Sequence, residues 1–115
     1  VDMAVLHNLM RNPIDGESIE FNDNRLSLYS AQKGKCAVTG KQMEADEVIC
    51  IKKIPKEQGG TDKYSNLLLV CRKIQELLNV KDIKTFSEEM DKLNLDKKQS
   101  DKLLKLRSLA FVESC

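Results

Sequence analysis

The chain has 115 residues, of which 41% are hydrophobic and 32% charged, and its formal net charge is +1. This length suits one small domain, and the composition argues against wholesale disorder. A net charge so close to zero does not indicate a general polyanion-binding protein. No segment approaches the ~18–20 consecutive apolar residues of a membrane span. Aromatic residues make up only 4%, so the core must be built mainly from aliphatic side chains.

The N-terminal third predicts two short helices with a strand between them. The apolar run Ala4–Met10 predicts a helix that an Asn-Pro pair ends. Ser18–Phe21 alternates in polarity and predicts a short strand. Asp23 or Asn24 then serves as the N-cap of a helix over Arg25–Gln32.

The centre of the chain predicts a two-stranded hairpin, a loop and a helix. Cys36–Val38 and Glu47–Ile51 are the predicted strands, since the second is rich in β-branched residues. Glu57–Asn66 contains a Gly-Gly pair and is expected to be a loop. The apolar Leu67–Val70 leads into a helix over Cys71–Asn79.

Two further helices are expected at the C-terminal end. Thr85 with Glu88, and Asp96 with Gln99, have the spacing of a helix-capping box. Apolar residues recur at helical spacing near each cap, at Ile83, Phe86, Met90 and Leu93 and then at Leu103, Leu106, Leu109 and Ala110.

Basic residues gather in two segments, although the net charge is small. One is Ile51–Lys63, with Lys52, Lys53, Lys56 and Lys63; the other is Lys97–Arg107, with Lys97, Lys98, Lys102, Lys105 and Arg107. Either could face phosphate groups. A solvated lysine surface explains each segment alone equally well.

The four cysteines bear on the compartment. Cys36, Cys50, Cys71 and Cys115 occur in a sequence without an export signal. Thiols in such chains are usually reduced, so we expect a cytoplasmic protein. The first residue is Val, which suggests a piece of a longer protein.

Four stretches carry a family resemblance: VDMAVLHNLMRNPI, NDNRLSLYSAQKGKCAVTGK, IPKEQGGTDKYSNLLLV and LNLDKKQSDKLLKLR. The second and third are the specific ones. With them the chain resembles, over its full length, the C-terminal region of bacterial group II intron-encoded reverse transcriptase/maturases. That region is a DNA-binding segment followed by an HNH endonuclease domain. The polymerase part of such proteins has no counterpart in this sequence.

The resemblance implies an α+β fold with two parts. Residues 1–33 would be an N-terminal helical arm similar to the DNA-binding segment. Residues 34–115 would be a degenerate HNH endonuclease-like domain, with a small ββα-metal (His-Me finger-like) hairpin-and-helix core and two C-terminal helices.

The resemblance also assigns motif positions. Such domains end a strand with tandem histidines, a metal ligand and a general base, and these positions are Ile51 and Lys52 here. Isoleucine has no lone pair for a metal, and lysine is protonated near neutral pH. The motif asparagine is Asn66, and the last metal ligand falls on Gln75. The only histidine, His7, lies far upstream. We therefore expect a scaffold without nuclease activity.

Many HNH domains also hold a structural zinc with two Cys-x-x-Cys pairs. Thr39 stands where the second thiolate of the first pair would be, and Cys50 and Cys71 are single. Tetrahedral zinc needs about four N or S ligands. We expect no structural zinc, and three small, partly buried thiols instead.

Three functions stay open. The favoured one is a degenerate HNH domain that keeps weak binding to duplex DNA through Lys52, Lys53, Lys56 and Lys63. It needs no cofactor, and its other partners would be the intron RNA or the reverse transcriptase part of the parent protein, with no membrane. The second is an active, Mg²⁺- or Mn²⁺-dependent nuclease with other oxygen donors, drawn from Asp46, Glu47, Asp62 and Gln75. The third is a protein-interaction module that presents Val5, Leu6, Leu9 and Met10 or the last helix.

Overall fold

The computed structural model describes residues 2–110 and has an α+β fold, as the sequence predicts. Within these residues five α-helices accompany one two-stranded antiparallel sheet. In chain order the elements are α1 (Met3–Arg11), α2 (Ile19–Ala31), β1 (Val48–Lys52), β2 (Leu67–Cys71), α3 (Arg72–Leu78), α4 (Ile83–Asp91) and α5 (Lys97–Ala110).

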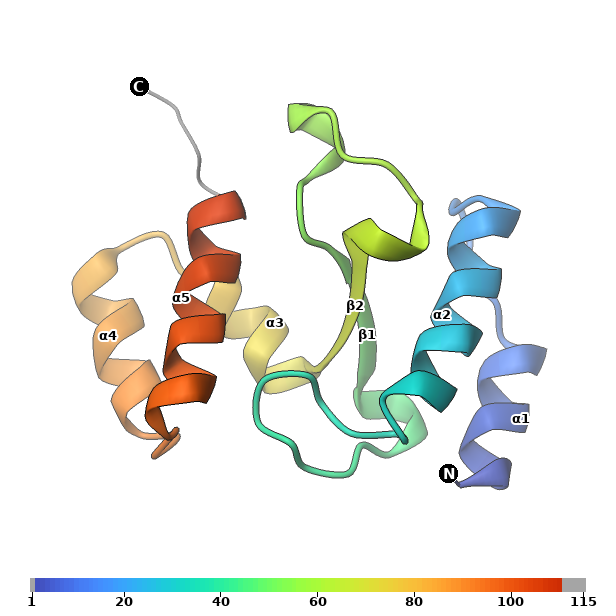
Figure 1. The fold of residues 1–115 in the computed structure, drawn as a ribbon, viewed down its shortest axis with the longest axis horizontal. Helices are drawn as coiled ribbons and strands as arrows, with labels where there is room; N and C mark the ends of the chain where they lie inside the picture. The colour runs from blue at the N-terminus through green and yellow to red at the C-terminus, as the bar shows by residue number, and fades with distance from the viewer. Residues whose placement is uncertain (1, 111–115) are drawn as a thin grey trace.

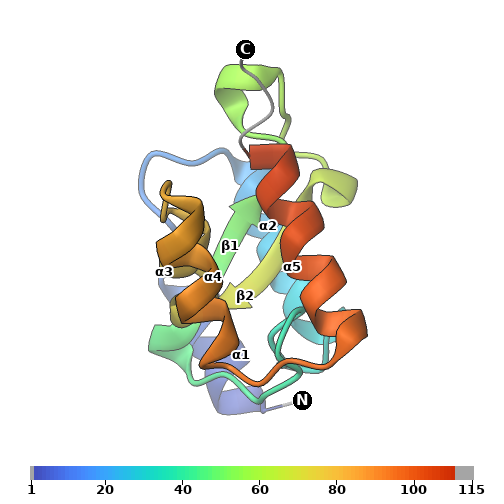
Figure 2. The same ribbon diagram turned by 90° about the vertical axis from the view of Figure 1, so that its left-hand side faces the viewer.

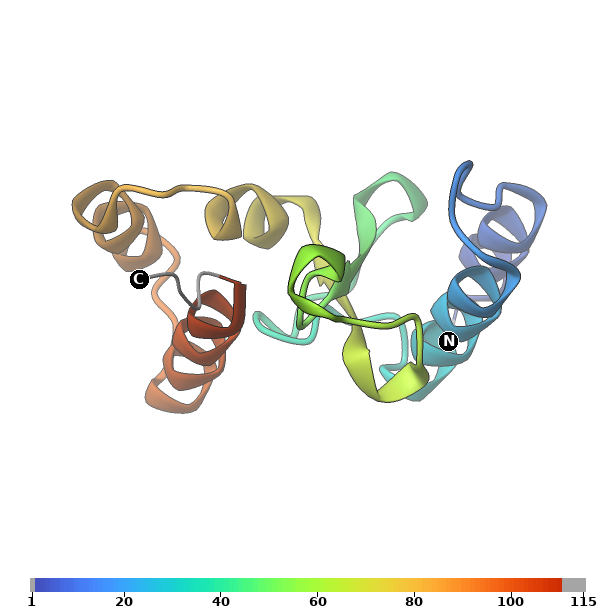
Figure 3. The same ribbon diagram turned by 90° about the horizontal axis from the view of Figure 1, so that it is seen from above.

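The hairpin lies in the centre, with α1 and α2 on one side and α4 and α5 on the other (Figure 1). Seen from above, the two helix pairs flank the strands, and α3 leads from β2 toward α4 (Figure 3). Turning the molecule by 90° brings α3, α4 and α5 in front of the hairpin (Figure 2). The two helix pairs therefore reach different faces of the hairpin.

The first two helices begin at local caps. The Asp2 carboxylate accepts hydrogen bonds from the N–H groups of Ala4 and Val5, and α1 follows. The strand predicted over Ser18–Phe21 is wrong. The Ser18 hydroxyl oxygen accepts the Phe21 N–H at 2.9 Å, so these residues form the first turn of α2. The caps predicted at Asp23 or Asn24 are wrong for the same reason.

The hairpin has a different partner strand from the predicted one. β1 pairs with β2 in the register Val48↔Cys71 to Lys52↔Leu67, whereas Cys36–Val38 lies in tight turns with a single bridge between Lys35 and Gln42. The apolar Leu67–Cys71 is the longer extended segment and makes the full ladder. The predicted second strand is confirmed with a shift of one residue.

The two C-terminal helices confirm one predicted cap and correct the other. Asp96 and Gln99 exchange side chain-to-backbone hydrogen bonds of 2.8 and 3.1 Å, a reciprocal capping box. At α4 the cap is Asp82, whose carboxylate accepts both the backbone N–H and the hydroxyl of Thr85. Thr85 is therefore a donor inside the first turn of α4 and not its cap.

One continuous core joins both ends of the described chain. It runs from Val5 and Leu9 on α1, through the hairpin, to Leu103 and Leu106 on α5. Val5 and Leu9, which the interaction-module hypothesis would expose, are buried. Of the predicted α4 stripe, Phe86 is buried while Ile83 faces solvent. Among residues 2–110, none of the helices combines the length and apolar character needed to cross a bilayer.

Candidate functional site

Ile51 and Gln75, which are far apart in the sequence, line the same cavity of about 350 Å³. Ile51 and Lys52 contribute to this cavity from β1, and Lys53 contributes from the residue after the strand. Gln75 and Asn79 contribute from α3 and its C-cap, one helical turn apart. The structure thus brings together the two positions predicted for metal ligands. Asn79 was not predicted, although its spacing of four from Gln75 points to the same helix face.

The donors around this cavity do not fit a metal ion. Ile51 is aliphatic, Lys52 and Lys53 are cationic, and the uncharged polar side chains are the amides of Gln75 and Asn79. Within residues 2–110, Glu57 is the one carboxylate in the lining. A divalent cation such as Mg²⁺ or Ca²⁺ binds several oxygen ligands, usually with carboxylates among them. Nowhere in residues 2–110 do three His, Cys, Asp or Glu side chains converge in a way that could hold a metal. No metal-dependent step can be derived from these residues.

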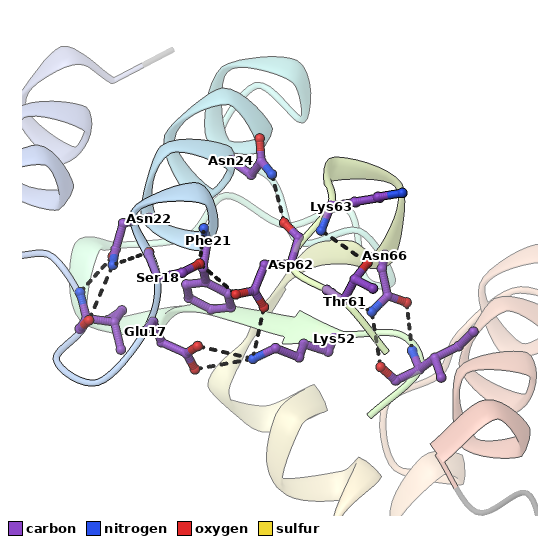
Figure 4. Close-up of polar contacts among 12 residues, drawn as sticks. Glu17, Ser18, Phe21, Asn22, Asn24, Lys52, Thr61, Asp62, Lys63 and Asn66 are labelled. Atoms are coloured by element: carbon purple, nitrogen blue, oxygen red, sulfur yellow. Dashed lines mark hydrogen bonds and ion pairs between the residues drawn. The ribbon is translucent and has the colours of Figure 1, made fainter. Parts of the chain in front are cut away.

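Lys52 points to the opposite face of β1, toward α2. Its Nζ lies 3.2 Å from Glu17 Oε1 and 3.5 Å from Asp62 Oδ1, and it sits 4.7 Å from the centroid of the Phe21 ring (Figure 4). Ser18 Oγ donates a 2.6 Å hydrogen bond to Asp62 Oδ2 and so holds this carboxylate in place. These residues form the Lys52 clamp, which ties the start of α2 to the loop between the strands.

The clamp keeps Lys52 charged. Burial by itself would lower the pKa of Lys52, but the hydrogen bond and charge of Glu17, and then Asp62, outweigh it and raise the pKa above its ordinary value. The pKa of Asp62 is lowered, first by the Ser18 hydrogen bond and then by Lys52. A protonated ammonium has no lone pair for a proton, so Lys52 cannot act as a general base.

Asn66 braces the loop between the strands. Its Nδ2 donates to the carbonyl oxygens of Ile54 and Thr61 at 3.1 and 2.8 Å, and its Oδ1 accepts the Ile54 N–H at 2.9 Å (Figure 4). Gly60 is needed at the same place, because a Cβ there would lie 1.7 Å from the Ile54 carbonyl oxygen. The observed role of Asn66 is to fix the backbone of the loop.

The four lysines predicted to contact phosphate lie in different surroundings. Lys52 is engaged by two carboxylates, while Lys53 lines the Ile51–Gln75 cavity. Lys56 and Lys63 are exposed on the loop. The structure therefore leaves Lys53, Lys56 and Lys63 with ammonium groups that no carboxylate within residues 2–110 pairs at ion-pair distance.

The alternative oxygen donors do not converge. Asp46 and Glu47 lie in a short 3₁₀ turn (Ala45–Glu47) just before β1. Ile51 lies near the opposite end of β1, where it shares the cavity with Gln75 of α3. Glu47 accepts the Glu44 N–H, and Asp62 belongs to the Lys52 clamp. His7 lies exposed on α1, far along the chain from the cavity. These positions assemble no second metal site.

Two of the cysteines come together. Cys36 Sγ accepts the N–H of Cys71 at 3.4 Å and that of Thr39 at 3.5 Å. Burial opposes ionisation of Cys36, but these hydrogen bonds, led by those of Thr39, lower its pKa. Cys50 lies apart near Arg25, and burial raises its pKa to about 12. Cys115, the fourth cysteine that the sequence analysis expects to be a reduced thiol, lies outside the described residues.

Comparisons with known proteins do not extend this picture. No protein-family model, curated protein or solved structure matches the chain. The functional argument therefore depends on the cavity, the clamp and the lysines of the chain itself, and the maturase resemblance stays a prediction.

Proposed function

We propose that this chain is a catalytically degenerate HNH endonuclease-like domain of the group II intron maturase type. It binds the phosphate backbone of duplex DNA without cutting it. The family assignment comes from the sequence motifs, and the fold that supports it is the order strand, loop, strand, helix over β1, β2 and α3. The predicted hairpin of Cys36–Val38 and Glu47–Ile51, followed by the loop, differs from this order. What agrees with the expected ββα core is the general pattern of two antiparallel strands followed by a helix.

One observation carries the proposal. The family resemblance implies Ile51 and Gln75 as the metal-ligand positions, and both line one cavity between β1 and α3. A residue pair chosen at random on a strand and a helix would not need to share a cavity. The agreement supports a ββα scaffold whose ligands have been replaced by groups that bind cations weakly or not at all.

Loss of the base completes the argument against catalysis. Activation of water requires a group that accepts a proton near neutral pH. Lys52 occupies the base position, and its raised pKa keeps it protonated. What remains near this site is electrostatic attraction between phosphate groups and lysines such as Lys53, Lys56 and Lys63. Contacts of lysine with phosphate carry no sequence readout of their own.

The test combines binding and cleavage. Fluorescence anisotropy of a labelled duplex, titrated with the chain at several NaCl concentrations, should show binding that weakens steeply with salt. Supercoiled plasmid incubated with the chain and Mg²⁺ or Mn²⁺ should stay uncut. Chelator-sensitive nicking would refute the proposed inactivity, and salt-independent or absent duplex binding would refute the proposed function.

A matched variant tests the scaffold itself. Ile51→His with Gln75→His restores imidazoles at the two ligand positions, and Asn79→His adds a third on the same helix face. Adding Lys52→His restores the motif base, at the expense of the clamp. Gain of nicking by the restored chain alone supports a nuclease-derived frame.

A further inference from the structure

The lysines of α5 lie on one face of the helix. Lys98, Lys102 and Lys105 are spaced at i, i+4 and i+7, which places them within about one sixth of the helix circumference. All three are exposed, while Leu103 and Leu106 of the same helix are buried in the core. The basic face of α5 is therefore presented to solvent by a helix that packing holds in place.

A fourth lysine joins this face from the hairpin. Lys53 follows β1 and, like Ile51, lines the cavity that Gln75 shares. It lines a cavity of about 190 Å³ together with Lys102 and Lys105, over a floor of Leu68, Leu106 and Leu109. The two basic segments of the sequence, Ile51–Lys63 and Lys97–Arg107, thus meet in space through Lys53.

The cavity continues in both directions. A neighbouring hollow, also of about 190 Å³, shares Lys102 and adds Lys98 and Gly40. At the other end, Lys53 and Leu106 also line the cavity of Ile51 and Gln75. These three hollows, linked by shared lining residues along α5, form one surface that we name the α5 groove. Gln99 ties α5 to the turn at Thr39 at one edge of the α5 groove, since its Nε2 donates a 3.2 Å hydrogen bond to the Thr39 carbonyl oxygen.

Among residues 2–110, acidic side chains are scarce along the α5 groove. No carboxylate of these residues lines the two hollows that hold Lys98, Lys102 and Lys105, and Glu57 lines the third hollow, which Ile51 and Gln75 share. Lys52, Lys73, Lys92 and Lys97 are each paired with an acidic side chain, whereas within residues 2–110 no carboxylate is paired with Lys53, Lys98, Lys102 or Lys105. Unpaired cations gathered along one groove create a field that attracts a polyanion.

We infer that the α5 groove is the surface that binds the sugar–phosphate backbone of duplex DNA. The inference rests on the proposed function and names its binding face, which extends from the former metal cavity along α5. Cations spread along a groove suit a repeated phosphate chain. Among residues 2–110, no aromatic side chain on which bases could stack lines the groove, so for this part of the chain a duplex with stacked bases inside is a better fit than a single strand.

The experiment compares variants of equal charge. Lys102→Ala/Lys105→Ala removes two groove lysines, and Lys81→Ala/Lys84→Ala removes two exposed lysines that line none of the three hollows. Alanine is favourable in helices, and circular dichroism checks that both variants fold. Dissociation constants for a labelled duplex are measured by anisotropy between 50 and 300 mM NaCl.

We expect the groove variant to lose about two units of the slope of log K against log [NaCl], which corresponds to roughly 10- to 60-fold weaker binding at 0.1 M salt. The control variant should stay within about twofold of the parent chain. Equal weakening of both variants would mean diffuse attraction and overturn the groove. Loss confined to Lys56→Ala/Lys63→Ala would move the site to the loop and leave the proposed function standing. Tighter binding to the matching single strand would overturn the choice of duplex. No duplex binding by the parent chain would overturn both proposals.

Discussion

Replacement of Gly60 by alanine should destabilise the loop between β1 and β2 more than replacement of its neighbour Gly59. A Cβ on Gly60 would lie 1.7 Å from the Ile54 carbonyl oxygen and 2.9 Å from the Pro55 carbonyl oxygen. A Cβ on Gly59 would have no neighbour within 4 Å. Both substitutions add the same methyl group to adjacent positions, so the comparison sets the steric clash at Gly60 against the backbone strain at Gly59.

The size of the effect follows from the displacement needed. Contacts of Cβ below 3.0 Å are essentially never tolerated, so the Ile54 carbonyl oxygen must move by at least about 1.3 Å from its place at 1.7 Å. That movement breaks the 3.1 Å hydrogen bond from Asn66 and disturbs the Gly60 N–H bond to Pro55. Two hydrogen bonds at about 1 kcal/mol each, with added backbone strain, give about 2–4 kcal/mol.

Gly59 has a φ of +89°, in the left-handed region. Alanine there should cost about 1–2 kcal/mol through conformational strain alone. Urea unfolding followed by far-UV circular dichroism gives both free energies of unfolding, if the transition is two-state. A Gly60→Ala variant no less stable than Gly59→Ala would refute the account of the loop in which Gly60 and Asn66 jointly fix its backbone.

Three further outcomes are expected. The variant Ile51→His/Gln75→His/Asn79→His should bind Co²⁺ with visible d–d absorption, and the parent chain should not; absence of any spectrum from the triple variant would argue against a shared cavity. Lys52→Met should remove a pH-dependent contribution of the Lys52 clamp to the free energy of unfolding. Asp62, with its pKa lowered from 3.8, contributes stability above that pH and loses it as the pH falls through the lowered value. Lys52, with its pKa raised from 10.5, contributes below that pH and loses it as the pH rises through the raised value. The difference in urea midpoint between the parent chain and Lys52→Met should therefore be constant from about pH 5 to 9 and shrink outside that window; a difference that varies with pH inside the window would contradict the clamp. Asp96→Ala should cost about 1 kcal/mol in the same unfolding assay because it removes the cap of α5, while Asp91→Ala, at the end of α4, serves as the control; equal losses would mean that the cap contributes nothing specific.

Local features of this protein could be predicted from its sequence. The helix over Ala4–Met10, the strand near Glu47–Ile51 and the capping box of Asp96 with Gln99 all occur, within a residue or two. Each depends on hydrogen bonds or side-chain periodicity within a few residues, so the local sequence is enough to predict it. Ile51 and Gln75 were singled out through the family resemblance, and their shared cavity is a finding of the structure.

Other features were decided only when the chain packed. Cys36–Val38 was the predicted partner of β1, whereas Leu67–Cys71 pairs with it in the structure. The choice depends on long-range burial that no local window contains. Lys52 and Lys53 are adjacent at the end of β1, and the position of α2 decides that Lys52 meets Glu17 and Asp62. Packing of α5 against the hairpin likewise brings Lys53 beside Lys102 and Lys105. The lysines, carboxylates and amides of the candidate site can be identified in the sequence. Which of them lie side by side is decided by the tertiary structure, because it depends on which apolar faces of α2, α3 and α5 pack against the two strands.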